Sequence, residues 1–399
     1  MAKALQFKII GRLGGTLARA GVIETPHGNI ETPAFIPVGT KATLKSLTPE
    51  QLEATGAQAV LANAYHLFLR PGPDIIDEAG GLHSFMHWDK PTFTDSGGFQ
   101  VMSLGAGFKK VIDMSGDGPE NVTKKKEKLA WIDNDGVRFK SYLDGSIHKL
   151  TPEISMQIQH SIGADITFAF DELTTLHHDY CYQVESLDQR THPWAVRSLA
   201  EHQRLNAERS HRPPQALFGV IQGANYEDLR RKSAKFLGAM EFDGYGLGGA
   251  LEKNKIGEIV RWMCEELPED KPRHMLGISE PDDIFACIEN GADTFDCVSP
   301  ARVGRNGALY TRHGRVNIRR AEFMRDYRPF DETCDCYTCQ HYTRAYLHHL
   351  FRSDELLANT LATIHNERFI VKLVDDIRES IKDGSFHTFK QAFLADYYS

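Results

Sequence analysis

Short apolar runs recur along most of the chain, and segments with a helical spacing of apolar residues lie between most of them. The runs cover residues 34–38, 59–64, 92–94, 166–170, 217–221, 245–247, 274–278 and 294–298. The helical segments cover residues 48–55, 152–162, 226–240, 256–267 and 281–290. Because each crossover between parallel strands must cover a face of the sheet, the alternation predicts an α/β fold, a closed (β/α)8 barrel of the TIM type.

Three segments do not fit the alternation. Residues 7–11, 16–23 and 28–31 alternate and turn like a small antiparallel sheet, which we expect to cap the barrel. Residues 105–145 predict an insertion after the third strand, either a hairpin or a mobile loop. Residues 182–211 predict one long charged helix.

The last part of the chain predicts a separate subdomain. Apolar positions keep helical spacing from residue 357 to residue 381, well beyond the eighth apolar run. We therefore expect the barrel, with its cap and insertion, over residues 1–304. A zinc-binding subdomain and C-terminal helices are expected over residues 305–399.

The zinc expectation comes from Cys334-Asp-Cys336-Tyr-Thr-Cys339, followed by His365 on the predicted helix. Three thiolates and one imidazole satisfy tetrahedral zinc, and a site filled by four protein ligands is structural. Seven cysteines are too few and too unevenly placed for a disulfide framework, so we expect reduced thiols and one zinc ion. Spacing alone leaves other histidines open as the fourth ligand, namely His341, His348 and His349.

Small and acidic residues follow the apolar runs in register. A single aspartate at a strand end usually caps a helix, but a barrel builds its active site from the carboxyl ends of successive strands. The repeated pattern therefore predicts an active site there. The residues are Asp95, Asp171, Gln222 with Gly223, Gly248 with Gly249, Gly277 and Asp296.

Composition limits where the protein acts. With 399 residues, 41% hydrophobic and 25% charged, the chain can bury a large core as one large domain or two to three small ones. An early apolar run that could act as a signal peptide is absent, as is an uninterrupted 18-residue apolar segment. We expect a cytoplasmic protein without a membrane anchor.

Charge is unevenly distributed. The net charge of -8 argues against a protein that coats nucleic acid by bulk electrostatics. Residues 301–352, however, carry ten arginines, no lysine and five acidic residues, an excess that is typical of phosphate contacts. A solvated face is the alternative interpretation. A second basic cluster lies in the predicted insertion and consists of Lys109, Lys110, Lys124, Lys125, Lys126 and Lys128.

The strand-end residues suggest a specific chemistry. Two carboxylates across a barrel mouth are typical of glycosidases, so Asp296 could attack an anomeric carbon while Asp95 moves the proton. Asp171 and Gln222 suit the hydrogen-bonding edge of a purine. Phe99 could stack on the base, and the glycines at 97, 98, 248 and 249 would allow close approach. Each residue also has an ordinary interpretation: turn cap, core aromatic or turn former.

Several motifs together resemble bacterial tRNA-guanine transglycosylases. They are Asp95-Ser-Gly-Gly-Phe-Gln100, Phe170-Asp-Glu172, Phe218-Gly-Val-Ile-Gln-Gly223, Gly248-Gly249, Phe295-Asp-Cys-Val298, the stretch 302–307 and the Cys334, Cys336, Cys339 and His365 set. The resemblance spans residues 7–393. It implies a TIM barrel with an inserted zinc subdomain that replaces guanine at wobble position 34 of tRNAs with GUN anticodons, those for Asp, Asn, His and Tyr. The incoming 7-deazaguanine, usually preQ1 in bacteria, leads to queuosine.

The resemblance also implies residue roles. Asp296 is the nucleophile on C1′ and Asp95 is the general acid/base. The base-binding residues are Ser96, Gly97, Gly98, Phe99, Asp171, Gln222, Gly248 and Gly249. The RNA-binding residues are Gly277, Ile278, Ser279, Glu280, Pro281, Asp282, Asp283, Ala301, Arg302, Val303, Gly304 and Arg305. The zinc subdomain supports tRNA binding and a homodimer.

The sequence departs from the family pattern near the base pocket. Leu173 stands where many members have cysteine, and Ala250 to Lys253 replace a common Leu-Ala-Val-Gly stretch. Ser279 and Glu280 also differ, and the insertion is longer than usual. These changes leave preQ1 and queuine open as the incoming base. Two other functions stay open: a barrel glycoside hydrolase, and a non-catalytic tRNA-binding paralogue, against which the retention of both Asp95 and Asp296 argues.

Overall fold

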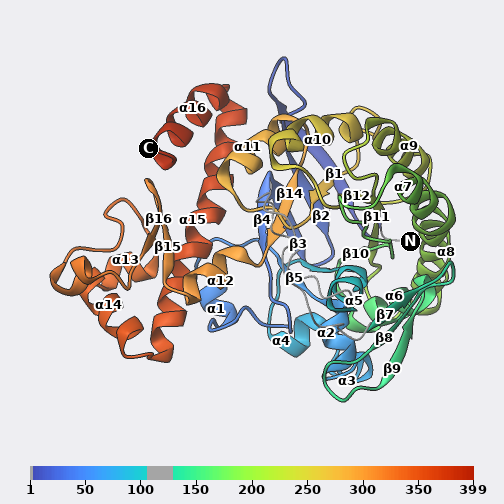
Figure 1. The fold of residues 1–399 in the computed structure, drawn as a ribbon, viewed down its shortest axis with the longest axis horizontal. Coiled ribbons are helices and arrows are strands. Elements are labelled where there is room, and N and C mark those ends of the chain that lie inside the picture. The colour runs from blue at the N-terminus through green and yellow to red at the C-terminus, as the bar shows by residue number, and fades with distance from the viewer. Residues whose placement is uncertain (1–2, 106–128) are drawn as a thin grey trace.

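A computed structural model describes residues 3–105 and 129–399 of the chain (Figure 1). Eight parallel strands form its centre. They are β4 (Ala34–Pro37), β5 (Val60–Ala62), β6 (Thr92–Thr94), β10 (Ile166–Phe168), β11 (Ala216–Ile221), β12 (Gly244–Leu247), β13 (Arg273–Met275) and β14 (Thr294–Cys297). Their order is β4-β14-β13-β12-β11-β10-β6-β5. A parallel bridge between Val38 and Leu61 joins the first strand to the last, so the predicted barrel is confirmed.

The strands are buried on both faces, which is why they read as apolar runs rather than as alternating ones. All six residues of β11 are buried, and Phe93, Phe168 and Phe218 pack in one buried cluster. Strands β10 and β13 end earlier than their apolar runs, at Phe168 and Met275. The residues beyond them turn into loops at the carboxyl end of the barrel.

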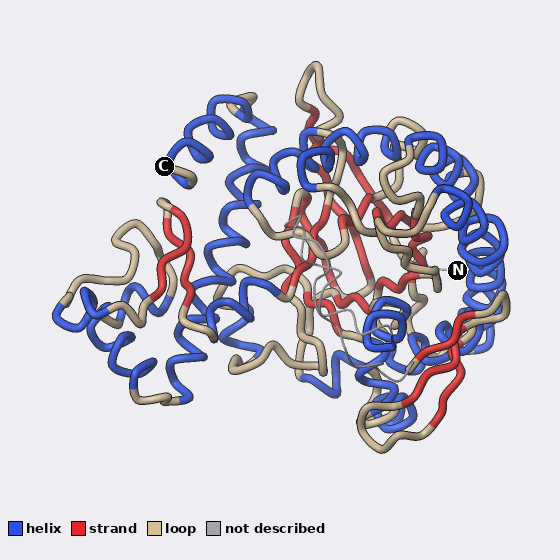
Figure 2. The backbone as a smooth tube through the Cα atoms, viewed as in Figure 1, coloured by secondary structure: helices blue, strands red, loops and turns tan. Residues whose placement is uncertain are grey.

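Helices surround the strands (Figure 2). Local signals fix their ends: in α6, the Thr151 side chain accepts from the Ile154 N–H, Pro152 starts the helix, and Gly163 with φ 77° ends it. The barrel helices are α1 (Pro49–Glu53), α2 (Ala64–Leu69), α3 (Pro73–Glu78), α4 (Leu82–Met86), α5 (Gly98–Gly105), α6 (Pro152–Ile162), α7 (Tyr180–Ser186), α8 (His192–Glu208), α9 (Glu227–Gly238), α10 (Ile256–Cys264), α11 (Pro281–Glu289) and α12 (Ser299–Arg305).

The predicted long charged helix is confirmed with one irregularity. A π-helical turn (Leu187–Thr191) joins α7 to α8. π-helical turns are rare in proteins, and those that occur inside α-helices are often found at functional sites. This turn carries Arg190, whose role is described below.

The predicted N-terminal cap is also confirmed. Strands β1 (Gln6–Arg12), β2 (Arg19–Thr25) and β3 (Gly28–Thr32) form an antiparallel sheet. Arg19 and Asp293 form a buried ion pair at 2.7 Å, which ties β2 to the residue that precedes β14. The cap therefore lies at the amino end of the barrel strands.

The described part of the insertion is an antiparallel sheet of β7 (Ala130–Ile132), β8 (Val137–Lys140) and β9 (Ile147–Leu150). A hairpin was one of the two structures predicted. This sheet extends past the predicted end at residue 145, because β9 pairs with β8 up to Leu150. All six lysines of the predicted basic cluster lie outside the described residues.

Beyond the barrel, the chain forms the hairpin β15 (Ala308–Thr311) and β16 (Gly314–Asn317), then α13 (Tyr337–His341), α14 (Arg344–Arg352), α15 (Leu356–Asp383) and α16 (Phe386–Tyr397). The long helix α15 stands between this hairpin and the barrel (Figure 1). Its Ile364 shares a buried cluster with Leu309 of the hairpin, and its Val374 shares another with Phe295 of β14. Among the described residues, none of the helices is long and apolar enough to cross a membrane.

Candidate active site

Asp95 lies directly after β6, where two neighbouring segments hold its carboxylate. The backbone N–H of Ala64 donates to Oδ1 at 2.9 Å, and the Asn63 side chain donates to Oδ2. Gln100 of α5 also donates to Oδ2, at 3.1 Å. Burial raises the pKa of Asp95 to about 7; the hydrogen bond from Ala64 opposes the rise and the charge of Asp296 adds to it. A carboxyl with this pKa can both give and take a proton near neutral pH.

Asp296 is part of β14, and its side chain is 14% exposed. Oδ1 accepts from the Gly277 N–H at 3.0 Å and lies 3.1 Å from His274 Nε2. On the other side of the ring, His274 Nδ1 lies 2.9 Å from Thr294 Oγ1. Because a carboxylate only accepts, His274 Nε2 carries the proton, and the imidazole holds Oδ1 in place. Oδ2 has no hydrogen-bond partner among the described residues, so this oxygen is available for attack.

The base-binding candidates Asp171 and Gln222 are in direct contact. Gln222 Nε2 donates to Asp171 Oδ2 at 2.7 Å, from the ends of two adjacent strands, β11 and β10. Burial raises the pKa of Asp171 to about 6; the bond from Gln222 opposes the rise, and the charge of Glu172 adds to it. The Ser96 hydroxyl also bonds to Asp171. Asp171, Gln222 and Ser96 therefore form one polar wall.

Glycines allow backbone to line this wall. A Cβ on Gly249 would lie 2.7 Å from Gln222 Oε1, and one on Gly248 would lie 3.0 Å from Gln222 Nε2. Gly98 is similarly close to the Asp171 carbonyl, at 3.1 Å. A side chain at any of the three positions would displace the wall. Gly97, with φ 79°, forms the turn between β6 and α5.

Phe99 is not a core residue. Its side chain is 42% exposed at the start of α5, three residues from the buried Ser96. An exposed aromatic ring beside a polar wall has a free face on which a planar base can stack. The interpretation of Phe99 as core packing is therefore wrong.

The two arginines after Asp296 lie on α12. Arg302 is exposed and Arg305 is partly buried, and neither guanidinium forms a hydrogen bond or an ion pair within the described residues. Burial lowers the pKa of Arg305, and the neighbouring charge of Arg302 lowers it further. Two unpaired guanidinium groups close together attract an anion such as a phosphate. Ala301 and Gly304 are buried and Val303 is partly buried.

The predicted RNA-binding stretch 277–283 divides into exposed and occupied residues. Gly277 is exposed, and Ile278 is partly buried. Glu280 accepts from Arg315 at 2.8 and 2.9 Å, and Asp282 accepts from Tyr398 at 2.7 Å. The remaining residues, Ser279, Pro281 and Asp283, are buried.

Sequence reasoning missed three residues of this site. Asn63, Gln100 and His274 hold Asp95 and Asp296. Asn63 follows β5 as Asp95 follows β6, so the strand-end pattern could have found it. His274 lies inside an apolar run, and no sequence signal separates it from an ordinary core histidine.

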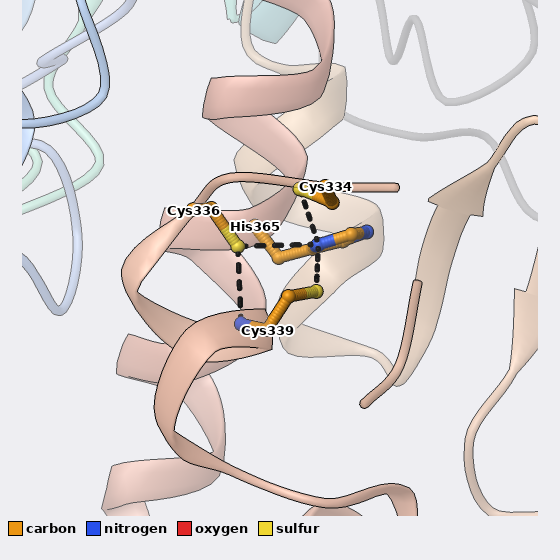
Figure 3. Close-up of side chains that lie close together, drawn as sticks. All are labelled: Cys334, Cys336, Cys339 and His365. Atoms are coloured by element: carbon orange, nitrogen blue, oxygen red, sulfur yellow. Dashed lines mark hydrogen bonds between the residues drawn. The ribbon is translucent and has the colours of Figure 1, made fainter. Parts of the chain in front are cut away.

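The four predicted zinc ligands lie together (Figure 3). His365 Nδ1 is 3.7 Å from Cys334 Sγ, 3.5 Å from Cys336 Sγ and 3.3 Å from Cys339 Sγ. Tetrahedral zinc with ordinary bond lengths would separate sulfur from nitrogen by about 3.6 Å. His365 Nε2–H donates to the Tyr310 carbonyl at 2.7 Å, which leaves Nδ1 free to bind metal. The set fits a structural metal ion, with His365 as the fourth ligand.

A second group of possible ligands lies at the amino end of the barrel. The Asp165 carboxylate is 2.6 Å from His27 Nδ1 and 3.0 Å from His83 Nε2. It also accepts from the Thr92 N–H at 2.8 Å. These direct hydrogen bonds satisfy the carboxylate, so we interpret the group as a polar network that joins the cap to the barrel.

Comparison with known proteins gives matches along nearly the whole chain. A family model described as queuine tRNA-ribosyltransferase matches residues 15–399. A protein of that name from Thermoanaerobacter pseudethanolicus is 46% identical over 397 residues, covering 99% of this chain and 98% of the relative. Those from Moorella thermoacetica and Staphylococcus epidermidis are 44% and 45% identical, covering 99% and 95% of this chain and 97% and 93% of the relatives.

Proposed function

The chain belongs to the queuine tRNA-ribosyltransferase family, and from this premise we propose that it exchanges guanine 34 of tRNA for a free 7-deazaguanine base. The protein is thus a tRNA-guanine transglycosylase, a glycosyltransferase of queuosine tRNA modification. The observation that carries the proposal is the pair of carboxylates, Asp95 and Asp296, together with the polar wall of Asp171 and Gln222.

The reaction needs two displacements at one carbon. Asp296 Oδ2 attacks C1′, the C1′–N9 bond breaks, and guanine leaves with the electron pair. Protonated Asp95 gives the departing base its proton. Asp95 then takes the N9 proton of the incoming base, whose electron pair attacks C1′ and releases Asp296. Two inversions retain the configuration at C1′, as in retaining glycosidases.

Recognition of the base follows from the donors and acceptors of the wall. Asp171 accepts from N1–H and the exocyclic amine, Gln222 Nε2 donates to the carbonyl oxygen O6, and Phe99 stacks on the ring. The glycines at 97, 98, 248 and 249 let the base approach the backbone. Adenine presents the opposite pattern on this edge, and so it is rejected.

Arg302 and Arg305 bind the anticodon around position 34. Their unpaired guanidinium groups support this role, and the substrates are the tRNAs for Asp, Asn, His and Tyr. Of the stretch 277–283, Gly277 offers its backbone to the RNA. The amide of Gly277 also holds Asp296, so RNA contact and nucleophile are linked.

The proposal is tested by incubating the protein with unmodified tRNA and radiolabelled guanine. We expect label to enter tRNAs with GUN anticodons and not tRNAs with other anticodons. A barrel glycoside hydrolase or a non-catalytic tRNA-binding paralogue would leave the tRNA unlabelled. Unlabelled tRNA would therefore refute the proposed exchange.

Among 7-deazaguanines we propose preQ1 as the incoming base, with queuine as the alternative. Leu173 and the stretch 250–253 differ from the common family pattern near the base, so the preference has to be measured on this protein. Competition of the two bases for displacement of labelled guanine from position 34 distinguishes them. A lower half-maximal concentration for queuine would reverse the assignment.

We also propose that one structural zinc ion fills the Cys334, Cys336, Cys339 and His365 site, and that the protein forms a homodimer through the adjacent surface. Tyr337, Tyr346 and Leu356 expose 48%, 40% and 80% of their surface near this site. Exposed aromatic and apolar side chains of this density are typical of interfaces. Light scattering that gives the monomer mass at micromolar concentration would contradict the dimer.

A further inference from the structure

Arg230 of α9 is a fully buried cation without a carboxylate partner among the described residues. Burial lowers its pKa to about 9, so the guanidinium remains charged at neutral pH. A buried charge costs free energy unless hydrogen bonds compensate it. The compensation comes from backbone: Nε donates to the Ala224 carbonyl at 2.7 Å, and Nη1 donates to the Gly248 carbonyl at 2.7 Å and the Ile221 carbonyl at 3.2 Å.

These carbonyls belong to the segments that carry the base-binding residues. Ile221 ends β11 directly before Gln222, and Gly248 follows β12 directly before Gly249. The guanidinium therefore fastens the ends of two adjacent strands from behind the polar wall. Its fourth polar contact, from Nη1 to Met263 Sδ at 3.6 Å, is weak.

Two polar atoms behind the wall lack partners. Arg230 Nη2 and Gln222 Oε1 are both buried, and neither has a hydrogen-bond partner within the described residues. Both lie close to the position that a Cβ on Gly249 would occupy, at 2.8 and 2.7 Å. The oxygen of the Gln222 amide is therefore on the guanidinium side, and the nitrogen is on the side of Asp171.

The opposite amide orientation is unfavourable on both sides. It would turn Oε1 toward the Asp171 carboxylate, and it would turn the Nε2 protons toward the positive guanidinium. A neutral side chain at position 230 would remove one of these two penalties, since only the Asp171 contact would then select the orientation. The charge of Arg230 thus contributes directly to which end of the amide meets the base.

We propose that Arg230 is a positioning residue that fixes the Gln222 amide with Nε2 toward the base and thereby selects bases with a strong acceptor at C6. The proposal rests on the proposed function, because it needs a guanine-type base on the Asp171 and Gln222 wall. The positive charge behind Oε1 also polarises the amide and strengthens the hydrogen bond that Nε2 donates. A purine whose C6 substituent is a weak acceptor gains less from this bond.

The test compares guanine with 6-thioguanine, in which sulfur, a poor acceptor, replaces O6. The kcat/KM for incorporation of each base into tRNA is measured for wild type, Arg230→Met and Arg230→Lys. We expect wild type to prefer guanine, and Arg230→Met to reduce that preference at least fivefold, mainly through a higher KM for guanine. Arg230→Lys keeps the charge but loses the planar guanidinium with its several N–H donors, and it should give an intermediate preference.

A matched control is Arg273→Met. Arg273 is also a buried arginine that donates to backbone carbonyls, those of Leu267 and Gly291 at 3.2 and 3.4 Å, but it lies at the start of β13. Its loss should lower thermal stability and leave the preference for guanine unchanged. In a Gln222→Ala background, Arg230→Lys should no longer alter the preference, because the amide through which it acts is absent.

Equal losses for both bases in Arg230→Met and Arg230→Lys would overturn the proposal and leave Arg230 a purely structural residue. An unchanged effect of Arg230→Lys in the Gln222→Ala background would overturn it too. If Arg230→Met does not fold, the lysine variant and the double variant still decide. A wild-type protein that incorporates neither base would instead refute the proposed function.

Discussion

At the scale of single residues, the two carboxylates of the site differ in environment. Asp296 is held through one oxygen by His274 and Gly277, and Asp95 is held through both oxygens. We predict that Asp296→Asn lowers the exchange rate roughly 1,000-fold or more while tRNA binding is unchanged. Asp95→Asn should lower it about 100- to 10,000-fold, since it removes the proton shuttle. Single-turnover exchange and filter binding measure the two effects; near-normal exchange by Asp296→Asn would exclude it as the nucleophile.

We predict that Asp171, as a proposed base-binding residue, makes base binding depend on pH. Its pKa of about 6 lies above the ordinary value, because burial disfavours the charged form. The base needs the ionised carboxylate as acceptor, so the dissociation constant for free guanine should be constant above pH 7. It should rise about tenfold per unit as pH falls through and below 6. Calorimetric titration from pH 5 to pH 8 measures this; Asp171→Asn should bind weakly at every pH and serves as the control.

At the residue scale, the sequence allowed us to predict those candidate site residues that lie at strand ends. Asp95, Asp171 and Gln222 were identified because a barrel turns its strand ends toward one site. Asn63 obeys the same rule but also caps α2 by accepting from the His66 N–H, and a cap is the ordinary explanation of such a residue. Arg230 was out of reach, because its importance comes from burial beneath β11 and β12, which a charged helix position does not reveal.

At the scale of elements, the π-helical turn between α7 and α8 holds the residue next to Asp171, which we propose to bind the base. Its Arg190 donates to Glu172, the neighbour of Asp171, at 2.5 Å and to Glu185 at 2.9 Å. The insertion joins here, since Trp194 of α8 donates to the Asn134 carbonyl at 2.8 Å in the turn between β7 and β8. The described part of the insertion therefore contacts α8, which directly follows the turn that carries Arg190.

This arrangement predicts a shift in the pH dependence of base binding. In Arg190→Gln, the buried carboxylate of Glu172 loses its ion-pair partner but keeps its hydrogen bond from Tyr182, and its charge raises the pKa of Asp171 further. The pH below which the dissociation constant for guanine rises should then increase by about one unit. The double variant Arg190→Gln/Glu172→Gln removes both charges and should return this pH to the wild-type value or below. An unchanged pH dependence in Arg190→Gln would show that the Arg190–Glu172 pair does not influence the pKa of Asp171.

The elements themselves were predicted well where one period of apolar residues dominates, as in α6 and β11. The strand ends were less predictable: the run that continues to Ile278 gave no sign that β13 stops at Met275. The loop residues there are apolar because they also pack against buried clusters: Leu276 contacts the cluster that holds Phe168, and Ile278 contacts the one that holds residues of α10 and α11. Hydrophobicity therefore does not mark the end of the strand. The π-helical turn could not be predicted from the sequence either, since one extra residue per turn leaves the charge pattern of the segment unchanged.

At the scale of the whole molecule, α15 joins the metal site to the barrel. It carries His365 of the metal site. Its Ile364 shares a buried cluster with Leu309, and its Val374 shares another with Phe295. We predict that His365→Ala removes the zinc ion and lowers the melting temperature by at least about 5 °C. His341→Ala, which changes an exposed histidine on α13, should keep one zinc ion per chain. Metal analysis and calorimetry measure both; a full zinc content in His365→Ala would exclude it as a ligand.

The distribution of charge over the molecule predicts how tRNA binding depends on salt. The chain is acidic overall, with a net charge of -8, so its bulk field repels RNA. We therefore propose that local cations such as Arg302 and Arg305 bind the tRNA. Each phosphate contact that is lost should reduce the slope of log affinity against log salt concentration by about 0.7 to 1. We predict such a reduction for Arg302→Gln and for Arg305→Gln. Arg328→Gln, in which the lost arginine is already paired with Asp326 at 2.7 Å, should leave the slope unchanged. If the arginines read bases without touching phosphates, affinity for the correct anticodon would fall while the slope stayed the same.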